Sequence, residues 1–194
     1  MLGFFSRRPK QHKKLALSEL SDDSQLTNRL FSGFYENLDM EKWRSSIQRV
    51  RQDSGAYGRF LLGGGYHFQA YRNPANDQDF RYCLKLATSQ FIDSYSEKHL
   101  RDWIQAVKTL VKNRVAMIPP MEFIQSDDYL AIVMPELSVA KGLVHKNSDF
   151  SGKVTLLEKE LRELGLEFRD GYQVGTWEGC PYIYDFSDLS FIQD

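Results

Sequence analysis

Strand-like segments of this chain come in adjacent pairs joined by short turns, and this pairing constrains the fold more than any other feature. One pair flanks the triple glycine at 63–65, a second turns at 126–128, and a third turns at Glu178 and Gly179. Antiparallel strands can be joined by tight turns, whereas parallel strands need a long crossover. Helix-patterned segments lie between these pairs and do not alternate with single strands, so the sequence predicts an α+β fold.

Four segments carry apolar residues at helical spacing. They span residues 18–38, 39–53, 96–114 and 152–168, and the last helix is expected to end near Gly165. The apolar stripes of the first two segments consist of Leu30, Phe31, Phe34, Tyr35, Leu38, Met40, Trp43, Ile47 and Val50. We expect these stripes to pack on the strands as a helical extension; the alternative is an exposed apolar patch that binds a partner.

Composition is typical of a soluble globular domain. The 194 residues are 42% hydrophobic and 26% charged, with a net charge of −1. So small a net charge creates no general attraction to nucleic acid, and we expect no nucleic-acid partner. No apolar run approaches the roughly 20 residues of a membrane span, and no secretory signal is visible. The two cysteines, Cys83 and Cys180, lack metal-binding spacing. We therefore predict a cytoplasmic protein with no transmembrane segment.

Charge is uneven in residues 1–17, which we expect to form a basic, flexible terminus. The apolar residues Leu2, Phe4 and Phe5 precede the cations Arg7, Arg8, Lys10, Lys13 and Lys14. A solvated terminus is the simpler interpretation, because Pro9 opposes a helix here. The alternative is a weak contact with a membrane surface, in which the apolar residues insert and the cations pair with anionic lipid.

In their order, these segments resemble the protein-kinase fold in a minimal, degenerate form, over roughly residues 57–191. A glycine-rich loop, a lysine on the third strand, a helix, two more strands and a hinge make up the small lobe of that family. The resemblance implies an antiparallel small lobe at 55–137 and a truncated large lobe at 138–194. A helical extension at 18–54 and the basic terminus at 1–17 precede them.

The glycine-rich loop is the first motif of this resemblance. Gly63 and Gly65 stand where the family's G-x-G-x-x-G has its first two glycines, with Gly64 between them and Phe68 in the third place. Glycine is expected there because a Cβ atom would keep backbone N–H groups away from phosphate oxygens. His67, just beyond the loop, is expected to be structural.

Lys85 and the hinge are the second and third motifs. Lys85, in the strand-like run 80–88, matches the family's V-A-I-K lysine. The resemblance implies that it contacts nucleotide phosphates and pairs with a carboxylate of the following helix, which leaves Glu97 and Asp102 as alternatives. The run IVMPEL resembles the strand that enters the hinge, and it implies that the backbone near Glu136 and Leu137 holds adenine.

The run LGLEFRDGYQVG resembles the segment that contains the family's catalytic loop, H-R-D-L-x-x-x-N. Arg169 and Asp170 match R-D, and Phe168 replaces the histidine. The implied general base is Asp170, which would accept a hydroxyl proton. This alignment puts Gly175 at the metal-binding asparagine. A shifted alignment makes Gln173 the metal ligand but puts Phe168 at the aspartate.

The run IYDFSDL supplies the last motif, because Asp185 begins D-F-S in place of D-F-G. The resemblance implies that Asp185 holds Mg²⁺ against phosphates, with Asp188 as a second carboxylate. The alternative is that Asp185 simply starts a turn. The 194 residues contain no counterpart of the activation segment or A-P-E motif. We therefore expect no protein phosphorylation by the usual route.

Three functions remain open from the sequence. The first is a pseudokinase-like binding or regulatory module that engages a protein partner and can bind ATP with Mg²⁺. The second is a small, atypical ATP-dependent phosphotransferase with Asp170 as its base. The third is an α+β protein-interaction domain that binds no nucleotide. Titration with ATP and Mg²⁺ separates the nucleotide-binding alternatives from the third.

Overall fold

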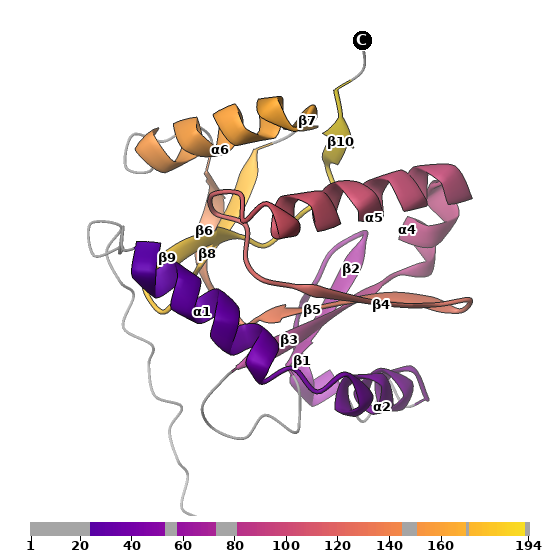
Figure 1. The fold of residues 1–194 in the computed structure, drawn as a ribbon. Helices are drawn as coiled ribbons and strands as arrows, with labels where there is room; N and C mark the ends of the chain where they lie inside the picture. The colour runs from indigo at the N-terminus through magenta and orange to yellow at the C-terminus, as the bar shows by residue number, and fades with distance from the viewer. Residues whose placement is uncertain (1–23, 53–57, 73–80, 145–150, 170, 193–194) are drawn as a thin grey trace, which may run out of the picture.

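The structure, a computed structural model, describes residues 24–52, 58–72, 81–144, 151–169 and 171–192. It has a five-stranded antiparallel sheet with helices on both faces, and two smaller antiparallel sheets (Figure 1). The predicted α+β class is confirmed. The helices are α1 (Ser24–Glu36), α2 (Met40–Gln52), the 3-10 helix η2 (Gly58–Phe60), α4 (Ser89–Ser94), α5 (Glu97–Lys112) and α6 (Ser151–Glu163). Within the described ranges, no helix has the length and apolar character needed to cross a membrane.

The large sheet has the strand order β1-β2-β3-β5-β4. Its strands are β1 (Leu61–Gly64), β2 (Phe68–Arg72), β3 (Tyr82–Ala87), β4 (Glu122–Ser126) and β5 (Tyr129–Pro135). The central strand β3 places Lys85 opposite Ala70 of β2 and Ile132 of β5. Because side chains alternate along a strand, Cys83 and Lys85 point to one face of the sheet, whereas Tyr82 and Leu84 point to the other.

The two faces of this sheet are covered by different helices. Cys83 belongs to a hydrophobic cluster with Trp103 and Leu110 of α5, whereas Tyr82 and Leu84 belong to a cluster with residues of α1 and α2. Figure 1 shows α5 on one side of the sheet and α2 on the other. The face that carries Lys85 is therefore the face that α5 partly covers.

The helical extension packs on the sheet as predicted. Leu30, Phe31 and Phe34 of α1 and Trp43, Ile47 and Val50 of α2 are buried in one cluster with strand residues that include Tyr71, Tyr82 and Val133. The Phe34 and Tyr82 rings meet edge to face, with centroids 5.4 Å apart. The predicted docking of both stripes is confirmed, so α1 and α2 are part of the folded domain.

Truncating Phe34 to alanine should lower the free energy of unfolding by about 3–5 kcal/mol, the usual cost of removing a buried aromatic ring. Phe34 is fully buried, so its removal leaves a cavity between α1 and the sheet. Urea denaturation of the variant measures the effect, and Glu36→Ala, an exposed change at the end of the same helix, is the control. A loss below about 1 kcal/mol, as surface changes give, would contradict the docking of α1.

The second half of the chain forms two small sheets. One contains β6 (Ser138–Val144), β8 (Tyr172–Trp177) and β9 (Cys180–Ile183), and the other pairs β7 (Leu166–Phe168) with β10 (Leu189–Phe191). The predicted turn at Glu178 and Gly179 joins β8 to β9. α6 ends before Gly165, whose φ of 69° suits glycine at a helix terminus.

Hydrogen bonds attach the segment that contains Asp185 to α5 and to the residues that follow this helix. The indole N–H of Trp103 donates to the carbonyl oxygen of Phe186 at 2.7 Å. The amide of Ile183 donates to the carbonyl oxygen of Met117 at 2.7 Å. Together they fix the segment that contains Asp185 against the large sheet and α5.

Candidate functional site

A pocket of about 590 Å³ lies where the edge of the large sheet meets the β8–β9 hairpin. It is lined by segments far apart in the sequence: β1 and the turn after it, β2, β3, the end of β5, β8, and the segment after β9. The predicted site residues among its lining are Gly63, Gly64, Gly65, Lys85, Glu136, Leu137, Gln173 and Asp185. The structure therefore brings these residues to one place.

The glycines form one wall of the pocket as part of the edge strand β1 and its turn. The amide of Gly65 donates to the carbonyl oxygen of Phe68 at 2.9 Å, which closes the turn. A Cβ built on Gly63 or Gly65 would meet no described atom within 4 Å, and neither residue has a positive φ. The fold itself therefore does not require glycine at these two positions, whereas close approach of a ligand would.

Phe68, in the place of the third glycine, is a core residue. It is 9% exposed, and its ring lies 4.8 Å from the Phe91 ring and 5.8 Å from the Trp103 ring, measured between centroids. His67 packs its ring on Phe91, at 5.4 Å between centroids, and its carbonyl oxygen accepts from the Thr88 amide. The back wall of the pocket is thus aromatic and built on α4 and α5.

Lys85 points into the pocket and contacts Tyr184. Its ammonium donates a hydrogen bond to the carbonyl oxygen of Tyr184 and lies 5.5 Å from the centroid of the Tyr184 ring. Burial lowers the pKa of Lys85, and the negative charge of Asp185 partly offsets this effect. A cation held in such a place is well suited to bind an anionic group that enters the pocket.

The two carboxylates expected as partners of Lys85 lie elsewhere. Glu97, at the start of α5, pairs with Arg101 one turn further along, and Asp102 is exposed. The adjacent Trp103 fills the inner face of α5, and its indole bonds to the Asp185-containing segment. In the described part of the chain, Lys85 is therefore held by a backbone carbonyl and an aromatic ring, and the expected helix carboxylate is not its partner.

Asp185 and Gln173 also line the pocket and contact each other. The Gln173 side-chain amide donates to Oδ2 of Asp185 at 3.1 Å, and the backbone amide of Ser187 donates to Oδ1 at 3.0 Å. Carboxylate and amide oxygens suit Mg²⁺, which commonly binds one or two carboxylates together with substrate phosphates. The Asp185 carboxylate and the Gln173 amide oxygen, which does not take part in this bond, are therefore the groups here that could hold Mg²⁺. No cluster of three or more His, Cys, Asp or Glu that could hold a metal by itself occurs among the described residues.

The two alignments of the catalytic-loop motif assign the metal ligand to Gly175 or to Gln173, and of these two Gln173 lines the pocket. A Cβ on Gly175 would lie 2.8 Å from Cβ of Leu137 and 3.2 Å from the carbonyl oxygen of Ser138, so this position has no room for a ligating side chain. The connection between β7 and β8 consists of residues 169–171. Asp170, the expected general base, lies outside the described residues.

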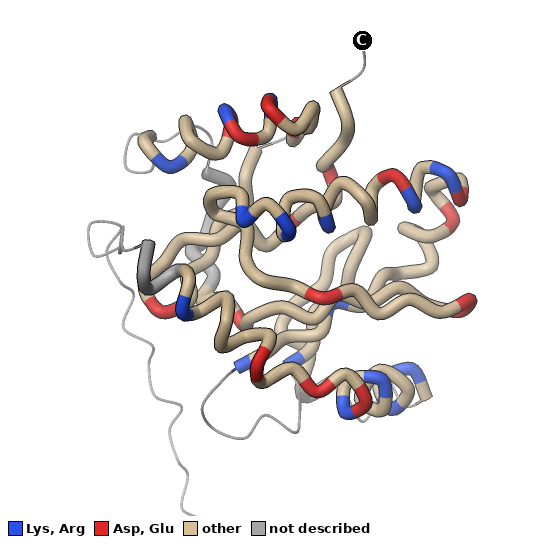
Figure 2. The backbone as a smooth tube through the Cα atoms, viewed as in Figure 1, with Lys and Arg blue, Asp and Glu red and all other residues tan. Residues whose placement is uncertain are grey.

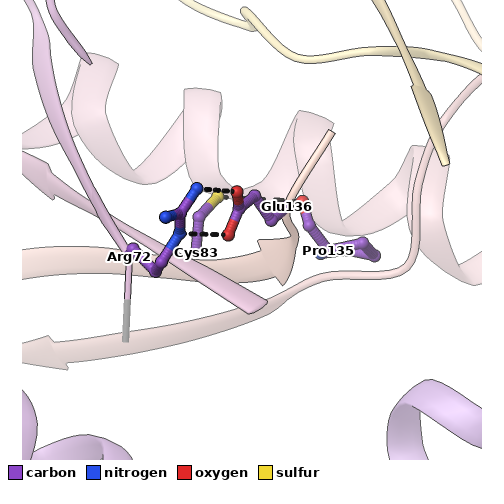
Figure 3. A network of polar contacts seen from close by, with 4 residues as sticks. All are labelled: Arg72, Cys83, Pro135 and Glu136. Atoms are coloured by element: carbon purple, nitrogen blue, oxygen red, sulfur yellow. Dashed lines mark hydrogen bonds and ion pairs between the residues drawn. The ribbon is translucent and has the colours of Figure 1, made fainter. Parts of the chain in front are cut away.

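The hinge-like segment is fixed by a salt bridge that the sequence did not predict (Figure 3). Arg72 of β2 donates to both carboxylate oxygens of Glu136, at 2.9 Å and 2.5 Å, and the Glu136 amide donates to the carbonyl oxygen of Arg81 at 2.7 Å. Glu136 is therefore engaged within the fold. The Leu137 backbone makes no hydrogen bond to another described residue, so its groups are the ones available to a ligand.

Cys83 lies beside this salt bridge and also lines the pocket. Its thiol donates to the carbonyl oxygen of Pro135 at 3.7 Å. Burial raises its pKa to about 12, so the residue is a neutral thiol and an unreactive part of the wall. The sequence offered a signal for Cys83, because it lies two residues before Lys85 on the same face of a strand, but it offered none for Arg72 or Tyr184.

Comparison with family models and with curated proteins finds no match to this chain.

Proposed function

We propose that this pocket is a nucleotide-binding site in a reduced protein-kinase-like fold, and that the protein is a pseudokinase-like binding or regulatory module. The observation that carries the proposal is the convergence of Gly63, Gly65, Lys85 and Asp185 on one pocket. These residues come from three separate parts of the chain, and the sequence pattern alone predicts each of them as a site residue. A pocket of about 590 Å³ also lies within the usual range for small-molecule sites.

A nucleotide would bind with its base beside the Leu137 backbone and its phosphates beneath the glycines. Lys85 supplies a positive charge for the phosphates, and the glycines let backbone amides approach them. Asp185 and Gln173 would hold Mg²⁺, which would neutralise further phosphate charge. The Arg72–Glu136 salt bridge fixes the segment before Leu137, so the base end of the pocket is preorganised.

Two observations favour binding over phosphoryl transfer. The connection at 169–171 between β7 and β8 is short, and the family's catalytic loop, which carries its base and its asparagine, needs more residues than this. Close packing at Gly175 leaves Gln173 as the polar side chain that the described part of this segment contributes to the pocket. Turnover of ATP that is lost in Asp170→Asn would instead support the phosphotransferase alternative.

Thermal unfolding with ATP and Mg²⁺ tests the proposal. A ligand that binds only the folded state adds about 2.7 kcal/mol of stability at 100 times its Kd. We expect the unfolding temperature to rise with ATP concentration in the presence of Mg²⁺. No rise with ATP, ADP or GTP, with Mg²⁺ or Mn²⁺ present, would reject nucleotide binding and leave a protein-interaction domain.

Replacing both Gly63 and Gly65 with alanine should weaken ATP binding about tenfold, because the added Cβ atoms would hold phosphates away from the backbone. The variant should unfold within about 1 kcal/mol of the unsubstituted protein, since each Cβ projects into open space. Calorimetric titration and urea denaturation measure the two effects. A stable variant with unchanged ATP affinity would show that the glycines do not face the ligand.

A further inference from the structure

Lys85 needs a partner inside the protein, and the structure supplies one from the strand segment that carries Asp185. An ammonium group in a partly buried pocket is destabilised unless a hydrogen bond or an electrostatic partner compensates. Its contacts are the carbonyl oxygen and the ring of Tyr184, whereas Glu97 of α5 pairs with Arg101 and Asp102 is exposed. The ring centroid lies 5.5 Å from Nζ, within the range of a cation–π interaction.

Tyr184 is itself held firmly on both sides. Its amide donates to the carbonyl oxygen of Gln173 at 2.9 Å, and the preceding Ile183 donates to the carbonyl oxygen of Met117 at 2.7 Å. The Tyr184 side chain is half-buried and lines the pocket. These backbone bonds fix the main chain at Tyr184, whose ring lies near the Lys85 ammonium.

We propose that Tyr184 is the positioning residue for Lys85, and that its ring keeps the ammonium directed at the ligand's phosphates. The inference rests on the proposed nucleotide site. A phosphate that enters the pocket can replace the Tyr184 carbonyl as hydrogen-bond acceptor, because Nζ has three donors. The ring contact needs no such exchange and persists when the ligand is bound.

In this arrangement, one short segment contains both the residue that positions Lys85 and the proposed metal ligand Asp185. Tyr184 holds Lys85, and the next residue, Asp185, faces Gln173. The same segment is tied to α5 by the bond from Trp103 to the Phe186 carbonyl oxygen. Lys85 is therefore held in place without a carboxylate from α5, and a shift of that helix is not needed to form the site.

Calorimetric titration with ATP and with adenosine tests the proposal, using Tyr184→Leu and the matched control Tyr184→Phe. A cation–π contact of about 0.5–2 kcal/mol corresponds to about 2- to 30-fold in affinity. Tyr184→Leu should lose affinity for ATP by such a factor and keep its affinity for adenosine, which has no phosphate. Tyr184→Phe, which retains the ring, should bind both like the unsubstituted protein.

Two outcomes of this titration would overturn the proposal and leave the nucleotide site standing. One is ATP affinity in Tyr184→Leu equal to that of the unsubstituted protein. The other is an equal loss for ATP and adenosine, which would make the ring only a wall of the pocket. In the Lys85→Met background, Tyr184→Leu should have no further effect on ATP affinity, because the two residues act through one contact.

A second measurement needs no nucleotide and separates this proposal from the proposed function. The rate at which trinitrobenzenesulfonate modifies Lys85, followed by peptide mass spectrometry, reports how well the amine is sheltered. We expect it to rise several-fold in Tyr184→Leu and to stay unchanged in Tyr184→Phe. Equal rates in all three proteins would overturn the positioning role. Failure of the unsubstituted protein to bind ATP would reject the nucleotide site and the direction of Lys85 toward phosphates, whereas the modification rates would still test the contact between Tyr184 and Lys85.

Discussion

Replacing Lys85 with methionine will weaken binding of ATP with Mg²⁺ about 10- to 100-fold, because a hydrogen bond to a charged group contributes about 1.5–3 kcal/mol. Lys85 is the only lysine or arginine among the described residues that line the pocket. Burial lowers the pKa of Lys85, which means that the charged form is less stable here than in water. The variant should therefore unfold at the same temperature as the unsubstituted protein or at a higher one.

Lys112→Met is the matched control for this variant. Lys112 is exposed in the last turn of α5, outside the pocket, so its loss should leave ATP affinity unchanged. Calorimetry measures affinity, and thermal unfolding without ligand measures stability. Full ATP affinity in Lys85→Met would show that the Lys85 ammonium does not bind the phosphates. A large loss of stability would show that the lysine is needed by the fold.

Replacing Asp185 with asparagine will remove the Mg²⁺-dependent part of ATP binding, which we expect to be about tenfold or more, as for other interactions with charged groups. Asparagine keeps the shape of the side chain and an oxygen for the Ser187 amide, but it carries no negative charge to hold the cation. Titrations with Mg²⁺ and with EDTA should give the same ATP affinity for this variant and different affinities for the unsubstituted protein.

Asp102→Asn makes the same chemical change on the exposed side of α5. It should retain both the ATP affinity and the dependence on Mg²⁺ of the unsubstituted protein. If the ATP affinity of Asp185→Asn still depended fully on Mg²⁺, the metal would have to bind elsewhere. Gln173, which contacts Asp185, would then not be a metal ligand either.

The order of the elements could be read from the sequence because periodicity and turn chemistry are local. The stripes of α1, α2 and α5 and the turns at 126–128 and at Glu178 and Gly179 are confirmed. The strands β6, β7 and β10 were not predicted. β7 and β10 each span three residues, which is too few for an alternating pattern to appear. α4, with six residues, is likewise too short to show a helical stripe.

The order of the motifs predicted which residues would line the site. It did not predict their hydrogen-bond and packing partners. The pairing of Lys85 with Tyr184 uses a backbone carbonyl, and every residue has one, so no side-chain pattern signals it. Phe68 departs from the glycine motif because it packs among the rings of Phe91 and Trp103. Such packing joins distant parts of the chain and becomes visible only in three dimensions.

Charged residues occur along most of the described elements (Figure 2). The charged residues in the described lining of the pocket are Lys85, Glu136 and Asp185. Lys85 and Asp185 have opposite charges and face the same space, and Glu136 is paired with Arg72. A ligand with a polyphosphate and a divalent cation therefore matches both groups, the ammonium for phosphate and the carboxylate for metal.

Backbone amide NMR of the ¹⁵N-labelled chain, titrated with ATP and Mg²⁺, tests the central claim most directly, because it reports both binding and its location. We expect saturable shifts with one Kd for the amides of Gly63, Gly65, Leu137 and Asp185, and unchanged signals for the exposed face of α2. A spectrum that ATP leaves unchanged, or shifts confined to residues outside the pocket, would contradict nucleotide binding in this pocket.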